Sequence, residues 1–164
     1  MVIPIANGVD IEATDFTGTR RKQISAALFV GYASDAKFSG YGLYFRCSDA
    51  TNTAAVADVS LPDGCSITKI KVYWNRGDAA ATGTMALYRY EKANPTATLT
   101  LLASADSNAS TGQHPVETTL GTPEVVDNTK YGYYFYSELN PNDSTLDVEC
   151  NGCEIEFTIT HPKP

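Results

Sequence analysis

The segment with the most reactive side chains in this sequence is Cys-Asn-Gly-Cys, residues 150–153. Asn-Gly is the preferred pair for a two-residue type I′ turn, so Cys150 and Cys153 would face each other across a tight hairpin. In that register the flanking acidic residues oppose one another in like-charged pairs, which costs stability in a ladder. A cation or a basic partner lying over this face would offset the repulsion. The acidic residues concerned are Asp147, Glu149, Glu154 and Glu156.

A second interpretation of the same segment is one long strand with a bulge at Gly152. A bulge adds one residue to one strand, and the apolar side chains that follow therefore change parity. The acidic residues would then lie on a solvated face. A metal site made from this CxxC and the two distant cysteines is a third interpretation, and it is weak because the chain has no second CxxC.

All four cysteines are disulfide candidates: Cys47, Cys65, Cys150 and Cys153. A bridge from Cys47 to Cys65 would tie the ends of a strand predicted over 54–61 and would contribute about 3 kcal/mol by restricting the unfolded chain. Cys150 and Cys153 could bridge only with strain in a hydrogen-bonded hairpin pair. We therefore predict that Cys47 and Cys65 are bonded, and that the other two are free, linked under strain or used between subunits.

Tyrosines are the second chemical signal. In the run YGYYFY, residues 131–136, alternate rings point to opposite faces of a strand, and one of these faces must be core. The other face is either a platform on which sugars stack or a surface buried against another subunit. The rings of this candidate platform are Tyr88, Tyr90, Tyr134 and Tyr136. The single tryptophan, Trp74, is in phase with Ile70 and Val72 and is predicted to be core.

Period-2 alternation recurs along the whole chain and predicts strands to position these residues. The clearest strand is 66–75, and the others are predicted at 22–29, 42–47, 54–61, 85–90, 98–105, 116–120, 130–137, 145–150 and 154–160, with a loop at 113–115. About ten short strands separated by Gly, Pro, Asn and Asp are typical of an all-β fold, an antiparallel β-sandwich of the jelly-roll type. We expect an N-terminal arm at 1–20, a single domain at 21–160 and a tail at 161–164.

Composition excludes several classes of partner. The formal charge of −7 repels phosphate backbones, and Arg20-Arg21-Lys22 is the longest basic cluster, so we expect no nucleic acid. No apolar run is long enough to cross a bilayer, and the first ten residues lack the basic start and apolar core of a signal peptide, so we expect no membrane partner.

We expect no enzyme activity and no obligatory cofactor. The two histidines are predicted in a loop, His114, and in the tail, His161, and the common hydrolase, zincin and nucleotide-binding motifs are absent from the sequence. Calcium is the one cation considered, since four aspartates fall at predicted loops, although turn aspartates serve their own backbone hydrogen bonds. They are Asp63, Asp78, Asp127 and Asp143.

Five segments of the chain resemble a family of uncharacterised bacterial, archaeal and phage-associated proteins: LPDGCSITKIKVYW, LYRY, VDNTKYGYYF, NPND and VECNGCEIEFT. The resemblance covers residues 20–160 and implies a single jelly-roll-like domain without catalytic residues to carry over. The sequence departs from the family pattern at CNGC, where an aromatic-Gly-aliphatic run is expected. The family pattern favours the single long strand at this position.

Two functions remain. The first is a structural subunit of an assembled particle, such as a phage or virus decoration or tail protein or a cell-surface filament. Its partners would be other copies of itself or other particle proteins, and it would be located in a virion or at the cell surface. The alternative is an extracellular carbohydrate-binding or adhesion module with glycans as partners, which requires exposed rings on one face.

Overall fold

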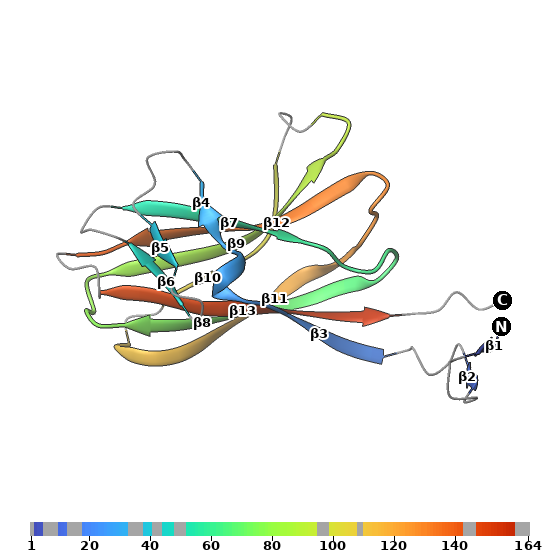
Figure 1. Cartoon of the computed structure of the whole chain (residues 1–164), viewed down its shortest axis with the longest axis horizontal. Coiled ribbons are helices and arrows are strands. Elements are labelled where there is room, and N and C mark those ends of the chain that lie inside the picture. The colour runs from blue at the N-terminus through green and yellow to red at the C-terminus, as the bar shows by residue number, and fades with distance from the viewer. Residues whose placement is uncertain are drawn as a thin grey trace.

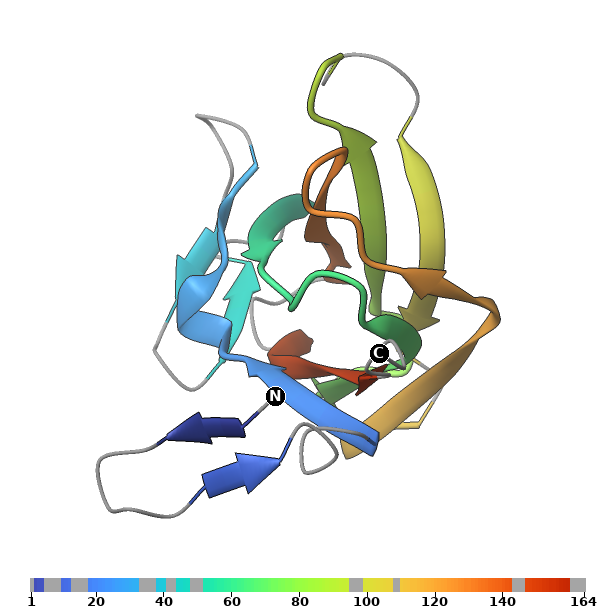
Figure 2. The ribbon, with the colours of Figure 1, turned by 90° about the vertical axis from the view of Figure 1, so that its right-hand side faces the viewer.

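The computed structural model describes residues 2–4, 10–12, 18–32, 38–40, 44–47, 52–94, 99–107, 110–142 and 147–159. Most of them lie in antiparallel strands. Two sheets face each other as a sandwich of the jelly-roll type (Figure 1), which confirms the predicted fold class. The residues predicted as an N-terminal arm contain a separate hairpin, β1 (Val2–Pro4) and β2 (Asp10–Glu12), which lies outside both sheets (Figure 2).

The first sheet, called here the β12 sheet, has the strand order β10-β9-β12-β7-β4. Its strands are β4 (Val30–Gly31), β7 (Thr53–Val59), β9 (Thr82–Glu91), β10 (Thr100–Asp106) and β12 (Tyr131–Asn140). The second sheet, the β13 sheet, has the order β11-β8-β13-β6-β5, and β3 also pairs with β13. Its strands are β3 (Gly18–Ile24), β5 (Phe38–Gly40), β6 (Phe45–Cys47), β8 (Ser66–Arg76), β11 (Gly112–Val125) and β13 (Val148–Ile159). A 3-10 turn, η2 (Ala26–Leu28), connects β3 to β4.

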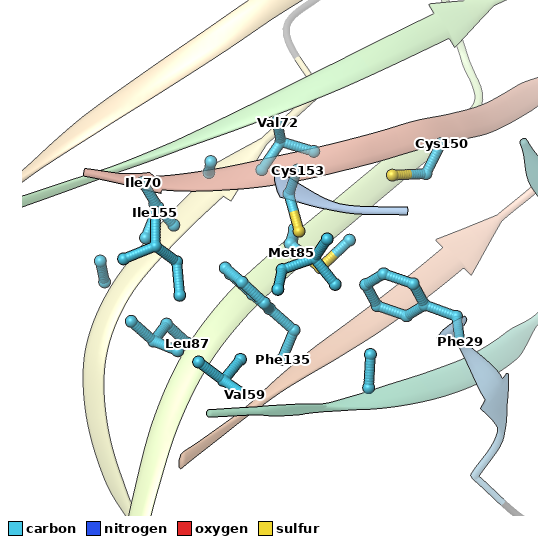
Figure 3. Packing of buried hydrophobic residues seen from close by; sticks show 14 of the residues in the cluster. Phe29, Val59, Ile70, Val72, Met85, Leu87, Phe135, Cys150, Cys153 and Ile155 are labelled. Carbon is cyan, nitrogen blue, oxygen red and sulfur yellow. The ribbon is translucent and has the colours of Figure 1, made fainter. Parts of the chain in front are cut away.

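The core lies between the two sheets and follows the alternation of their strands. Figure 3 shows residues that meet there: Ile70, Val72, Cys150, Cys153 and Ile155 from the β13 sheet, and Val59, Met85, Leu87 and Phe135 from the β12 sheet. Trp74 is in the core as predicted, with 1% of its surface exposed. Its ring lies against Gly83 of β9, where a Cβ atom would come within 2.6 Å of it.

Residues 113–115, predicted as a loop, lie inside β11, so that prediction is wrong. Pro115 pairs with Tyr73 in the ladder. Proline is tolerated there because β11 is the edge strand of its sheet, where the missing N–H leaves no partner unsatisfied.

The segment CNGC forms no hairpin, because β13 runs through it as one strand. Cys150 pairs with Trp74 of β8 and Cys153 pairs with Val72, so three steps along β13 match two steps along β8. The extra residue is accommodated at Gly152, whose φ is +111°. The interpretation as a long strand with a bulge is therefore confirmed, and long-range pairing on both sides of β13 overrides the local turn signal.

The predicted bridge between Cys47 and Cys65 is wrong, because all four cysteines are buried free thiols. Cys47 ends β6, next to Arg46, which pairs with Glu149 of β13. Cys65 precedes Ser66, which pairs with Thr158 near the other end of β13. At about 3.3 Å per residue, the two cysteines lie roughly 30 Å apart along that strand, whereas a disulfide requires Cα atoms within about 7 Å.

Replacing Gly152 with alanine should strongly destabilise the fold. The added Cβ would lie 2.8 Å from the backbone oxygen of Ile24, and alanine rarely adopts a φ of +111°. We expect the free energy of unfolding to fall by about 2 kcal/mol or more in chemical denaturation. Gly121→Ala is the matched control, because Gly121 has open space around it and no positive φ. Equal losses for the two variants would contradict the role of the bulge.

The buried thiols should be chemically silent in the native protein. Desolvation raises the pKa of Cys65 to about 11 and that of Cys150 to about 12, from 9.0, so neither forms thiolate at pH 8. Iodoacetamide followed by mass spectrometry should label none of the four in the native state and all four in denaturant. Recovery of only two labelled cysteines in denaturant would show that a disulfide exists after all.

The raised thiol pKa values also set a pH dependence. The unfolded thiols ionise near pH 9, whereas the folded ones stay neutral up to about pH 11. Their contribution to stability is therefore complete below pH 9 and is lost as pH rises toward 11–12. Denaturation midpoints measured from pH 8 to 11 should fall, and replacing Cys150 with alanine should flatten that fall.

Candidate functional site

The four tyrosines predicted as a platform lie together on the outer face of the β12 sheet. Tyr88 and Tyr90 come from β9, Tyr134 and Tyr136 from β12, and Tyr88 is directly opposite Tyr134 in the ladder. All four are half-buried. Their alternate neighbours fill the core, so these rings point away from it.

The rings form an ordered cluster rather than a random group. Tyr88 and Tyr134 are nearly parallel, with centroids 5.6 Å apart and planes inclined by 20°. Tyr136 stands at 82° to Tyr88, and Tyr32 stands at 86° to Tyr136 with centroids 5.4 Å apart. These four rings and Leu99 line an open hollow of about 320 Å³. We call these five residues together with Tyr90 the aromatic face.

Sequence reasoning missed two parts of this face, Tyr32 and Leu99. Tyr32 is 63% exposed, and its amide donates to the carbonyl of Ala54 (2.9 Å), which extends the pairing of β4 with β7. Leu99 is 48% exposed and directly precedes β10. Tyr32 follows no alternating run, whereas Leu99 lies in the strand predicted over 98–105. Only pairings between distant segments bring the two to one hollow, so the sequence carried no signal that placed them there.

Polar acceptors and further apolar groups border the rings. One row across the sheet runs from Asp58 of β7 through Tyr134 and Tyr88 to Leu101 of β10. Leu101 is more than half exposed. The row therefore offers a carboxylate at one end, two rings in the middle and an aliphatic side chain at the other end.

Gly132 holds the ring of Tyr90 against the sheet. It is directly opposite Tyr90 in the ladder. A Cβ atom on Gly132 would lie 2.3 Å from the Tyr90 ring, so the ring covers the bare backbone of β12. The missing side chain thus fixes the orientation of Tyr90.

The phenols of the aromatic face are hydrogen-bond donors at neutral pH. Desolvation is the main cause that raises the pKa of Tyr134 and of Tyr136 above 10.0, and the charge of Glu138 adds to the effect on Tyr136. A protonated phenol both donates and accepts hydrogen bonds, so it can meet a hydroxyl group in either role.

The four acidic residues in and just before β13 already have hydrogen-bond partners within the chain, so they need no cation or external basic partner. They are Asp147, Glu149, Glu154 and Glu156. Glu149 accepts from Asn75 Nδ2 (2.8 Å) and from Arg46 Nη1 (3.4 Å), which lie on the strands to either side. Asp147 Oδ2 accepts from the backbone amide of Asn142 (3.0 Å).

The other two acids of this group are satisfied in the same way. Glu154 Oε1 accepts from Gln23 Nε2 (2.7 Å) and from the Tyr73 hydroxyl (2.8 Å), and Glu156 pairs with Arg21 (3.3 Å). The predicted opposition of like charges is wrong, because it assumed the hairpin. The partners come instead from β3, β6 and β8 of the same chain.

The aspartates considered for calcium mostly serve turns, and Asp143 lies outside the described residues. Asp63 accepts from the amide of Asn128 (2.7 Å), and Asp127 accepts from the amide and hydroxyl of Thr129 (3.0 and 2.6 Å). Across the described residues, no three His, Cys, Asp or Glu side chains gather in a way that could hold a metal ion. The same part of the chain contains no helix of the length and apolarity needed to span a membrane.

Solved structures with a similar fold include carbohydrate-binding modules and enzyme chains that contain them. The C-terminal family 6 module of a marine laminarinase from Zobellia galactanivorans has a TM-score of 0.51 at 14% identity, covering 83% of this chain and 98% of that one. The CBM22–GH10 modules of a Clostridium thermocellum xylanase complexed with xylohexaose have a TM-score of 0.51 at 12% identity. The tandem CBM22 modules of a Paenibacillus barcinonensis protein have a TM-score of 0.50 at 13% identity.

These last two matches cover 86% and 85% of this chain, which spans only 28% and 50% of the respective solved chains. No family model and no curated protein matches the sequence. The resemblance to an uncharacterised family therefore stays a prediction.

The predicted role as a structural subunit of an assembled particle is overturned by these comparisons. The fold is similar to that of carbohydrate-binding modules, and this similarity favours the alternative hypothesis. A location in a virion and partners that are particle proteins or further copies of the chain depended on that role and have no support.

Gly132→Ala tests how Tyr90 is held. Because the Cβ would collide with the ring, we expect a loss of about 1–2 kcal/mol in the free energy of unfolding. In a Tyr90→Ala background the ring is absent, so the same substitution should cost much less. A double-mutant cycle in urea measures this coupling. Strictly additive losses would show that the two residues act independently.

Proposed function

We propose that this protein is a non-catalytic, extracellular carbohydrate-binding module, and that its ligand lies on the aromatic face of the β12 sheet. One observation carries the proposal: five tyrosine rings gather on the solvent side of one sheet, and four of them border a single open hollow. Rings on the solvent side of a sheet add nothing to the core between the sheets. A ligand that uses them explains why so many lie together.

The chemistry of the face suits a sugar. A pyranose ring has apolar C–H faces and a rim of hydroxyl groups, and it is bound by stacking on an aromatic ring together with hydrogen bonds at its edge. The near-parallel Tyr88 and Tyr134 supply the stacking surface, and Tyr136 stands at nearly a right angle to Tyr88 beside it. The phenols and the carboxylate of Asp58 supply donors and acceptors.

The size of the hollow is also suitable. Its volume of about 320 Å³ lies at the lower end of the range for small-molecule sites, about 300–1,000 Å³. Because it is open, a polysaccharide could occupy it with one or two units while the rest of the chain continues across the sheet.

The fold supports the same proposal by analogy. The similar solved structures are or contain carbohydrate-binding modules, and the CBM22–GH10 modules of the Clostridium thermocellum xylanase were solved in complex with xylohexaose. Similarity of fold alone does not determine function, so the tyrosine rings are the main support for sugar binding.

The test is binding to a panel of soluble polysaccharides by isothermal titration calorimetry. Removing one stacking ring costs about 1 kcal/mol or more, so Tyr134→Ala and Tyr88→Ala should each weaken binding by about five- to tenfold. Their unfolding free energies should fall little, because both rings are half-buried on the outer face.

Tyr73→Ala is the matched control. Tyr73 is also half-buried on a strand, but it lies on the outer face of the β13 sheet, where it donates to Glu154. Its loss should leave polysaccharide affinity unchanged. Equal weakening by Tyr73→Ala and Tyr134→Ala, or the absence of binding to any polysaccharide, would refute the proposal.

A further inference from the structure

Basic residues are distributed very unevenly between the two sheets. The five strands of the β12 sheet contain a single basic residue, Arg89, and it pairs with Glu124 at 2.7 Å. The strands of the β13 sheet contain seven: Arg20, Arg21, Lys22, Arg46, Lys69, Lys71 and Arg76. In the described strands, the aromatic face therefore has no cation of its own. Lys92, directly after β9, donates to the carbonyl of Asn128 (2.6 Å), and Lys130, directly before β12, lies over the Tyr131 ring.

Acidic side chains border the aromatic face instead. Asp58 is directly opposite Tyr134, and Glu138 follows two residues after Tyr136 on the same side of β12. Both acids are exposed. Desolvation raises the pKa of Tyr136, and the charge of the nearby Glu138 adds to this shift.

A third acid lies on the same face at the β10 edge. Asp106 is exposed and pairs with Thr84, which in turn pairs with Glu138. Three carboxylates thus accompany the rings, and the described strands of the sheet offer no outward-facing cation to offset them.

Such carboxylates attract neutral glycans and repel anionic ones. An ionised carboxylate only accepts hydrogen bonds, so it can bind the hydroxyl groups of a neutral sugar. It repels the carboxylate of a uronic acid or a sulfate ester, and this repulsion reaches about 10 Å at 0.1 M salt. Every acid of the face therefore favours an uncharged ligand over a charged one.

We propose that the aromatic face selects neutral polysaccharides and rejects uronate-containing or sulfated ones, with Asp58 and Glu138 as specificity-determining residues. This inference rests on the proposed function. It adds the class of ligand, and it is carried by the charge of the face rather than by the rings.

The experiment compares polysaccharides that share a backbone and differ in charge: hydroxyethylcellulose with carboxymethylcellulose, and laminarin with sulfated laminarin. Calorimetry at low and at physiological salt gives both affinities of each pair. In any pair that binds, the neutral member should bind about tenfold more tightly at low salt. Physiological salt should narrow the difference by weakening the repulsion.

The variants Asp58→Asn and Glu138→Gln keep the side-chain shape and remove the charge. Together they should raise the affinity for the anionic member several-fold and change the affinity for the neutral member by less. Glu117→Gln is the matched control, since Glu117 lies on the β13 sheet, where it pairs with Lys71 at 3.0 Å. It should leave the discrimination intact.

The outcomes separate the two claims. Equal or tighter binding of the anionic members, with Tyr134→Ala still weakening binding, would overturn this inference and leave the proposed function standing. Discrimination that survives in the double variant would likewise overturn it. Failure of every polysaccharide to bind would refute the proposed function, and this inference with it.

Discussion

Gly152 lies where β13 passes the end of β3, and its bare backbone comes so close to Ile24 that no side chain fits. The bulge it forms shifts the parity of β13 by one residue. Cys150 before the bulge and Ile155 after it can therefore both face the core. Without this shift, one half of the strand would bury Glu154 and expose Ile155, so the packing of the two sheets depends on a single residue with a φ of +111°.

The same shift gives the sandwich two chemically different outer faces. Every acidic side chain of β13 turns outward or sideways and finds a donor on β3, β6 or β8, as Glu149 does with Arg46 and Glu156 with Arg21. Arg46 and Glu149 are largely buried, so their pairing offsets part of the cost of burying two charges. The more exposed pair of Arg21 with Glu156 contributes little. In the described part of the chain, the outer face of the β12 sheet has no such row of ion pairs, and tyrosines occupy its centre.

Local patterns of the sequence were sufficient for what depends on alternation. They predicted most of the strands, the core position of Trp74, the common face of the four platform tyrosines and, as one of three interpretations, the bulge at Gly152. They failed where the distance between two residues is set by the pairing of strands that are far apart in the sequence. The bond between Cys47 and Cys65 was wrong because the register of β13 separates them, and Tyr32 was missed because β4 reaches β7 only in the folded chain.

The aromatic face combines two kinds of support. Tyr88 and Tyr134 lie on the long neighbouring strands β9 and β12. The ladder of these strands runs over ten residue pairs and fixes the positions of both rings. Tyr32 and Leu99 lie just beyond the ends of edge strands. Substitution at these two border positions would reshape the hollow without disturbing the ladder, whereas the central rings are constrained by it. A scaffold built this way allows the border of the hollow to change while the central rings keep their positions.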